Sequence, residues 1–94
     1  MPHDQMYQCE QKKLFKVSGV KEWRWVEREV SGLPSGRDKG IRCKHCHGEV
    51  RVHVKKAENG PADHVEHLRR EDSEHCQGGF YFKGEHRRSQ FAVG

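Results

Sequence analysis

The sequence has few apolar residues and no long apolar run. Only 32% of its residues are hydrophobic, 34% are charged, and the mean hydropathy is -1.11. No segment approaches the roughly 18 apolar residues of a membrane span. Residues 1–11 also lack the apolar run of a secretory signal peptide. These absences predict a soluble, cytoplasmic chain without a membrane partner.

A chain of 94 residues with so few apolar side chains can build only a thin core. Small domains of this kind often need a metal or disulfides for stability. Because disulfides are rare in a reducing cytosol, the four cysteines suit metal binding better than cross-linking. A bound Zn²⁺ can contribute on the order of 10 kcal/mol, comparable with the stability of a whole domain. We therefore expect one zinc-binding domain over residues 13–94, preceded by a flexible N-terminal arm over residues 1–12.

The firmest metal-binding signal is the pair Cys43 and Cys46, a C-x₂-C motif followed by Gly48. Two thiolates on one tight turn can occupy two corners of a tetrahedron around Zn²⁺. A glycine just beyond the second cysteine is typical of a zinc knuckle, in which backbone N–H groups point at the sulfurs. The motif therefore predicts half of a tetrahedral zinc site.

Three residues compete for the other two corners, namely His64, His67 and Cys76. His64 with His67 would complete a Cys₂His₂ set, and His67 with Cys76 would complete a Cys₃His set. Polar residues flank Cys76 on both sides, so ligation explains its thiol better than packing does. We favour Cys43, Cys46, His67 and Cys76 as the metal ligands. His64 is the alternative ligand, or a neighbour that orients the site.

Hydrophobic patterning predicts the elements around this site. Residues 14–17 and 20–26 are two strands joined by a Ser-Gly turn, and alternation over residues 49–55 is typical of a half-buried strand. Asp63 can cap a helix over residues 64–70, and residues 80–82 form a short aromatic strand. The predicted fold is a small α+β zinc-stabilised domain. Its zinc knuckle, β-hairpin and short helix are treble-clef-like and pack with an N-terminal β-hairpin.

Two tryptophans, Trp23 and Trp25, would share one face of the first hairpin. Aromatic rings beside basic residues can stack on unpaired bases. In a chain so poor in apolar residues, however, we expect these rings to form the core, and the same holds for Phe80 and Phe82.

Cys43-x-x-Cys46, a strand, Gly60, the string His64-Val65-Glu66-His67 and Cys76 together resemble the N-terminal zinc-binding segment of competence protein CoiA-like proteins. That family carries a C-x-x-C motif, a β-hairpin and an H-F-x-H motif followed by a cysteine, and it is associated with DNA uptake and nuclease-like domains. The resemblance covers residues 43–76, and Val65 stands where the family has phenylalanine. It implies a zinc site and an association with DNA. The nuclease part of such proteins is a separate domain, for which this chain has no room.

The same residues raise the question of catalysis, because Glu66 lies between two histidines like a general base. A catalytic zinc needs an open coordination position. Two thiolates at the knuckle disfavour one, and neither an H-E-x-x-H motif nor the zinc deaminase order of motifs is present. We expect a structural metal and no enzymatic activity.

Charge is distributed unevenly along the chain. Residues 37–56 carry seven basic and two acidic residues, whereas residues 57–76 carry two basic and six acidic ones. The basic part predicts phosphate contacts with DNA or RNA. The predicted nucleic-acid-binding residues are Arg42, Lys44, Arg51, Lys55 and Lys56. The alternative is a protein-interaction module, an adaptor or inhibitor that uses its aromatic strands and an acidic helix face at Glu71, Asp72 and Glu74.

Overall fold

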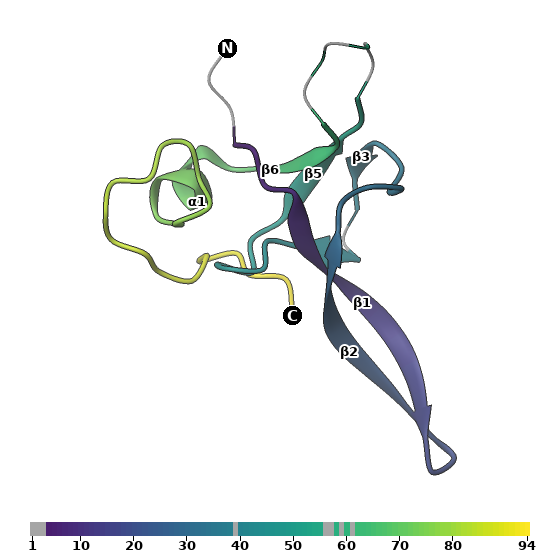
Figure 1. The fold of residues 1–94 in the computed structure, drawn as a ribbon. Coiled ribbons are helices and arrows are strands. Elements are labelled where there is room, and N and C mark those ends of the chain that lie inside the picture. The colour runs from purple at the N-terminus through teal and green to yellow at the C-terminus, as the bar shows by residue number, and fades with distance from the viewer. Residues whose placement is uncertain (1–3, 39, 56–57, 59, 61) are drawn as a thin grey trace.

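The protein is described by a computed structural model that covers residues 4–38, 40–55, 58, 60 and 62–94. Its elements form two three-stranded sheets, ordered β2-β1-β4 and β3-β5-β6, and one short helix (Figure 1). The elements are β1 (Gln8–Val17), β2 (Val20–Glu29), β3 (Gly36–Arg37), β4 (Ile41–Arg42), β5 (Val50–His53), β6 (His64–His67) and α1 (Arg70–Glu74). The α+β class is therefore confirmed. Among the described residues, no helix has the length and apolar character needed to cross a membrane.

Strands β1 and β2 form the predicted N-terminal hairpin, which is longer than the sequence indicated. They pair antiparallel from Gln8 opposite Glu29 to Val17 opposite Val20. The turn places Ser18 and Gly19 at φ values of 51° and 81°. Two consecutive left-handed residues match the twist of a tight two-residue hairpin. The outer part of the hairpin extends away from the rest of the molecule (Figure 1).

The described part of the predicted arm, residues 4–12, belongs to the folded structure. Strand β1 begins at Gln8, and Asp4, Met6 and Cys9 are buried. Met6 exchanges backbone hydrogen bonds with Val65 of β6. The composition of this segment is polar, but its few apolar side chains are needed by a small core. Our prediction of a flexible arm over residues 1–12 is therefore wrong for residues 4–12.

The predicted alternation around β5 is confirmed, because Val50 and Val52 are buried while Arg51 is exposed. The predicted helix over residues 64–70 is wrong. Residues His64–His67 form strand β6, which pairs antiparallel with β5, and the helix α1 begins only at Arg70. Pairing with β5 satisfies the backbone of this segment and buries Val65 against Val52, which a single isolated helical turn could not do.

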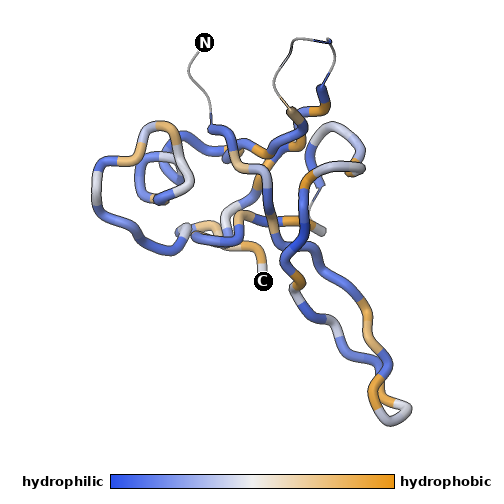
Figure 2. Tube along the Cα trace, in the orientation of Figure 1, coloured by the Kyte–Doolittle hydropathy of each residue, from blue (hydrophilic) through white to orange (hydrophobic). Residues whose placement is uncertain are grey.

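Cysteines make up a large share of the core. Of the eleven buried hydrophobic residues described, four are cysteines, and the others include Val30, Ile41 and Val50. The large aromatic side chains are not buried as predicted: Trp23 is 61% exposed and Phe80 57% exposed. Residues 80–82 lie in turn and coil, not in a strand. Figure 2 shows apolar residues near the tip of the β1–β2 hairpin, far from the core.

Candidate metal centre

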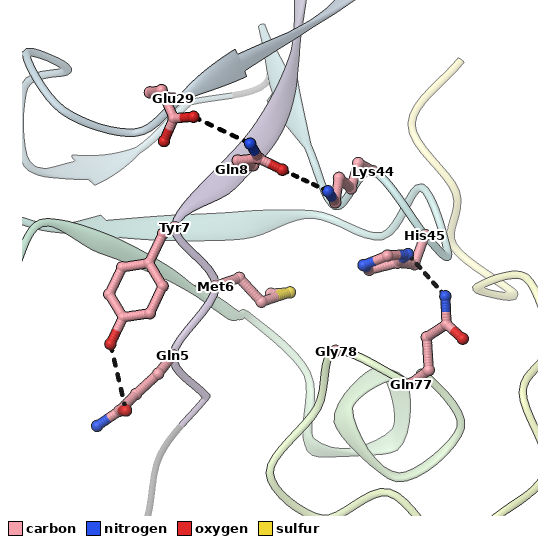
Figure 3. A pocket seen from close by; sticks show the side chains of 9 residues that line it. All are labelled: Gln5, Met6, Tyr7, Gln8, Glu29, Lys44, His45, Gln77 and Gly78. Atoms are coloured by element: carbon pink, nitrogen blue, oxygen red, sulfur yellow. Dashed lines mark hydrogen bonds between the residues drawn. The ribbon is translucent and has the colours of Figure 1, made fainter.

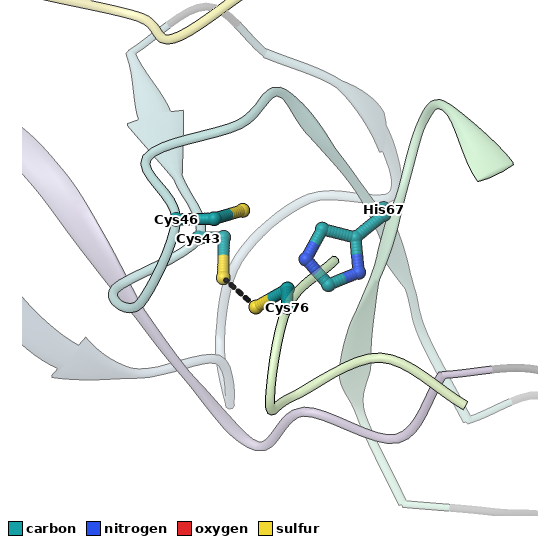
Figure 4. Close-up of side chains that lie close together, drawn as sticks. All are labelled: Cys43, Cys46, His67 and Cys76. Carbon is teal, nitrogen blue, oxygen red and sulfur yellow. Dashed lines mark hydrogen bonds between the residues drawn. The ribbon is translucent and has the colours of Figure 1, made fainter. Parts of the chain in front are cut away.

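Three cysteines and one histidine meet at the centre of the fold. Sulfur or nitrogen atoms of Cys43, Cys46, His67 and Cys76 all lie within 4.8 Å of one another (Figure 4). Cys43 and Cys46 lie in the turn between β4 and β5, His67 ends β6, and Cys76 follows α1. This group is the set favoured from the sequence. The three cysteine residues are buried and none forms a disulfide.

The distance between two of the sulfurs is compatible with a shared metal ion. Sγ of Cys43 lies 3.7 Å from Sγ of Cys76, far longer than the roughly 2.05 Å of a disulfide. Sulfurs about 2.3 Å from a tetrahedral ion would be about 3.8 Å apart. The four side chains are therefore compatible with a metal ion held by three sulfurs and one nitrogen.

Each of the three sulfurs accepts a backbone hydrogen bond from the residue two positions later. His45 N–H donates to Cys43, Gly48 N–H to Cys46, and Gly78 N–H to Cys76, each at 3.4 Å. Such bonds stabilise the charged thiolate form. The first two bonds have the geometry expected of the predicted knuckle, and the third gives a second turn of the same kind, the knuckle at Cys76.

Both knuckles require glycine because neighbouring atoms approach too closely for a side chain. A Cβ on Gly48 would lie 2.6 Å from Oδ2 of Asp72, and one on Gly79 would overlap the backbone carbonyl of Ser73. Gly79 N–H also donates to the Cys76 carbonyl at 2.8 Å, closing the second turn. The tight turns that bring the sulfurs together therefore leave no room for a side chain at these two positions.

The imidazole of His67 is oriented by the buried carboxylate of Asp4. Nδ1 of His67 lies 2.8 Å from Oδ2 of Asp4. The other nitrogen, Nε2, is buried without a hydrogen-bond partner among the described residues. It faces the sulfurs of Cys43 and Cys76, which interact with the ring. A carboxylate on one nitrogen with the other aimed at a metal is the usual arrangement around zinc.

Asp4 itself is held by several donors besides the imidazole. Its Oδ2 accepts from the backbone N–H of His67 at 2.8 Å, and its Oδ1 accepts from Ser73 Oγ at 2.7 Å and from Phe80 N–H at 2.6 Å. Burial alone would raise the pKa of Asp4, but the bonds from His67, Phe80 and Ser73 outweigh it and lower the pKa to about 2. The carboxylate is therefore charged at neutral pH. It also joins the N-terminal segment to β6, α1 and the turn that follows.

The thiols and the imidazole of the cluster shift one another's pKa values. Hydrogen bonds from Cys46 and Cys76 outweigh burial and lower the pKa of Cys43, which favours its thiolate form. Its hydrogen bond to Cys43 raises the pKa of Cys46 in turn. Burial would lower the pKa of His67, but Asp4 and the two neighbouring sulfurs raise it to about 11. The four side chains are therefore close enough to shift the pKa values of Cys43, Cys46 and His67 strongly.

Neighbouring residues cover the cluster. Met6 Sδ lies 3.7 Å from Cys43 Sγ. On the side of the protein surface, Met6 and Gly78 line an open cavity of about 460 Å³ (Figure 3). On the knuckle, Ser89 N–H donates to the Cys46 carbonyl and Val93 N–H to the His47 carbonyl, each at 2.8 Å. The C-terminal segment therefore closes over the first knuckle.

His64, the alternative ligand, is not part of the cluster. Residues 64 and 67 are three apart in a strand, so their side chains point to opposite faces. Nδ1 of His64 lies 2.8 Å from the Ala62 carbonyl, its Nε2 lies 3.1 Å from Glu66, and its ring stacks on His53. The treble-clef-like arrangement is not confirmed, because the second ligand pair, His67 and Cys76, lies on either side of α1 instead of at a helix N-terminus.

The structure brings only some of the predicted nucleic-acid-binding residues to the surface. Arg42 is buried: it pairs with Glu10 at 2.7 Å, donates to the Val93 carbonyl at 2.8 Å and lies 4.1 Å from the Trp25 ring. Its predicted phosphate contact is therefore wrong.

Of the other four, Lys44 donates to Gln8 and lies 3.4 Å from Glu27. Arg51 and Lys55 are exposed, and Lys56 lies outside the described residues. Only two of the five predicted side chains are thus described as exposed.

Two further buried residues, Cys9 and Asp4, lie outside the four candidate ligands. Cys9, a lone thiol in the sequence, is fully buried in the core outside the metal cluster, and burial raises its pKa. Asp4 is the residue beside the candidate site that the sequence did not indicate. It lies 63 positions from His67, and its only sequence signal is an acidic residue among polar neighbours.

A protein-family model that carries no functional description matches residues 1–94, so the chain belongs to that family. No curated protein and no solved structure matches the chain. The resemblance to competence protein CoiA-like proteins therefore stays a prediction.

Proposed function

We propose that the protein is a small zinc-stabilised binding module, in which Cys43, Cys46, His67 and Cys76 hold a structural Zn²⁺. The observation that carries this proposal is the buried cluster of three thiols facing the Nε2 of an imidazole oriented by Asp4. Soft sulfur donors with one imidazole in a tetrahedral arrangement suit zinc. The metal would join the two knuckles to β6 and so contribute much of the stability of the domain.

The role of the metal in this proposal is structural and not catalytic. Four protein ligands fill a tetrahedral shell and leave no position for a reacting water. The one candidate base, Glu66, lies 3.1 Å from Nε2 of both His53 and His64. Its carboxylate is therefore engaged by two rings outside the cluster.

Elemental analysis of the purified protein tests the metal site. We expect one zinc per chain, and we expect Cys76→Ser to lose the metal and the folded structure. Cys9→Ala is the matched control, because it removes a buried thiol outside the cluster and should keep the zinc. A Cys76→Ser protein that retains full zinc content and its fold would contradict the ligand set.

We further propose that the module binds nucleic acid. The support is the net charge of +4 and the exposed basic residues Arg51 and Lys55 on and beside β5. Charge reversal of both residues should weaken binding to DNA or RNA of any sequence, and affinity should fall with salt. Binding that does not change with salt would contradict this proposal.

The alternative function, a protein-interaction module, is favoured by the exposed aromatic rings of Phe80 and Phe91, which are 57% and 53% exposed. A protein partner that stays bound after nuclease treatment and in high salt, and that is lost in a Phe80→Ser variant, would support it over nucleic-acid binding.

A further inference from the structure

The outer part of the β1–β2 hairpin, residues 12–24, is exposed on both of its faces. It contains five basic residues and one acidic residue, a net charge of +4. The whole chain also carries +4, so the remaining residues contribute thirteen charges of each sign. The entire excess of positive charge therefore lies on this projecting hairpin (Figure 1).

One face of the hairpin combines positive charge with tryptophan. In the register, Lys12 lies opposite Trp25, Leu14 opposite Trp23, and Lys16 opposite Lys21. Residues directly opposite each other share a face, and so do residues two apart in one strand. The face that we call the basic face therefore carries three lysines, two tryptophans, one leucine and no acidic residue: Lys12, Leu14, Lys16, Lys21, Trp23 and Trp25.

The other face of the same hairpin has a different character. Lys13 lies opposite Arg24, Phe15 opposite Glu22, and Val17 opposite Val20. Here Glu22 accepts a hydrogen bond from Arg24 at 2.7 Å, and the guanidinium lies 5.5 Å from the Phe15 ring. Its acidic residue and its internal ion pair leave this face with less charge available for a partner.

The two tryptophans of the basic face differ in their surroundings. Trp25 lies at the base of the hairpin, where the guanidinium of Arg42 is 4.1 Å from its ring. Trp23 is farther out and 61% exposed. The ammonium of Lys12 lies 5.8 Å from the Trp23 ring and 6.0 Å from the Trp25 ring. Contact between this exposed indole and a flat partner would remove apolar surface from water, which is favourable.

We propose that the basic face binds single-stranded nucleic acid. Trp23 would stack on an unpaired base, while Lys12, Lys16 and Lys21 would contact phosphates before and after it. This inference rests on the proposed nucleic-acid binding, but it assigns the contact to the hairpin instead of to β5. A second copy of the chain is a poorer partner for this face, because two such faces would bring six lysines together. A single strand, in contrast, offers both negative phosphates and flat unpaired bases, and this face places lysines beside exposed rings.

Fluorescence anisotropy with a short labelled oligothymidylate tests the proposal on the purified, metal-bound protein. Trp23→Ala should weaken binding about tenfold or more, as loss of one base–aromatic stack does, and Trp23→Phe should recover most of the loss. Phe15→Ala is the matched control on the opposite face and should change affinity little. Replacing Lys16 by Ala should also lower the slope of log affinity against log salt by about 0.7, whereas Lys13→Ala should leave the slope unchanged.

Several results would overturn the inference. Equal losses in Trp23→Ala and Phe15→Ala would do so, as would binding of the wild type to anionic vesicles but not to the oligonucleotide. If hairpin variants keep full affinity while charge reversal at Arg51 and Lys55 abolishes it, the hairpin site is wrong and the proposed function stands. If the wild type binds no nucleic acid, both proposals fail. Zinc content measured for each variant separates loss of the partner from loss of the fold.

Discussion

Asp4→Asn is the substitution that most sharply separates a metal centre from a coincidental group of buried thiols. The carboxylate is 5% exposed and accepts four hydrogen bonds, two at each oxygen. Asparagine has nearly the same shape but offers one oxygen and one NH₂ group. Whichever way the amide is turned, two buried donors then face another donor.

The size of the expected effect follows from those bonds. A hydrogen bond to a charged acceptor contributes about 1.5–3 kcal/mol, so the loss of two should lower the free energy of unfolding by on the order of 3 kcal/mol. The substitution also removes the charge that orients His67 and increases its basicity. Loss of such a carboxylate partner typically lowers metal affinity by about 10–100-fold.

Competition with a chromophoric zinc chelator at neutral pH measures this affinity directly. Asp38→Asn is the matched control, because Asp38 is an exposed carboxylate that accepts a hydrogen bond from Gly40 N–H, away from the cluster. We expect wild-type zinc affinity in the control and the stated loss in Asp4→Asn. Equal affinities in the two variants would refute the role that we assign to Asp4.

Three further predictions concern the same centre. Gly79→Ala should destabilise the protein by about 1–3 kcal/mol in urea unfolding, because its Cβ would overlap the Ser73 carbonyl, whereas Gly94→Ala, in open space, should leave stability unchanged. Removal of the metal with a strong chelator should abolish the cooperative thermal transition, and a transition that persists at the same temperature would contradict a structural role. Zinc affinity should rise between about pH 6 and pH 8, because the metal displaces protons from the thiols and from His67, whose pKa is raised to about 11. Chelator competition measures this affinity across the range. An affinity that does not change with pH would contradict these ligands.

Short-range patterns in the sequence predicted the parts of the fold that depend on few neighbours. The C-x₂-C pair with Gly48 determines its own turn, and the Ser-Gly turn determines the hairpin that it joins. Cys76 was predicted to lie at the cluster because an otherwise unexplained thiol among polar residues needs a partner. In these cases, the chemistry of one or two residues is decisive.

The parts that the sequence did not predict depend on contacts between distant residues. The string at residues 64–67 fits one helical turn or a short strand equally well, and only pairing with β5 decides between them. Asp4 becomes important only when the chain brings it to His67, which is 63 positions away. Tryptophan was expected in the core because of its size, but cysteines and valines fill that small core instead.

X-ray absorption spectroscopy at the zinc edge of the purified protein would identify the ligands of the metal. We expect a single four-coordinate zinc with three sulfurs at about 2.3 Å and one nitrogen at about 2.0–2.1 Å. A shell dominated by nitrogen and oxygen, or a folded protein that binds no metal, would contradict it.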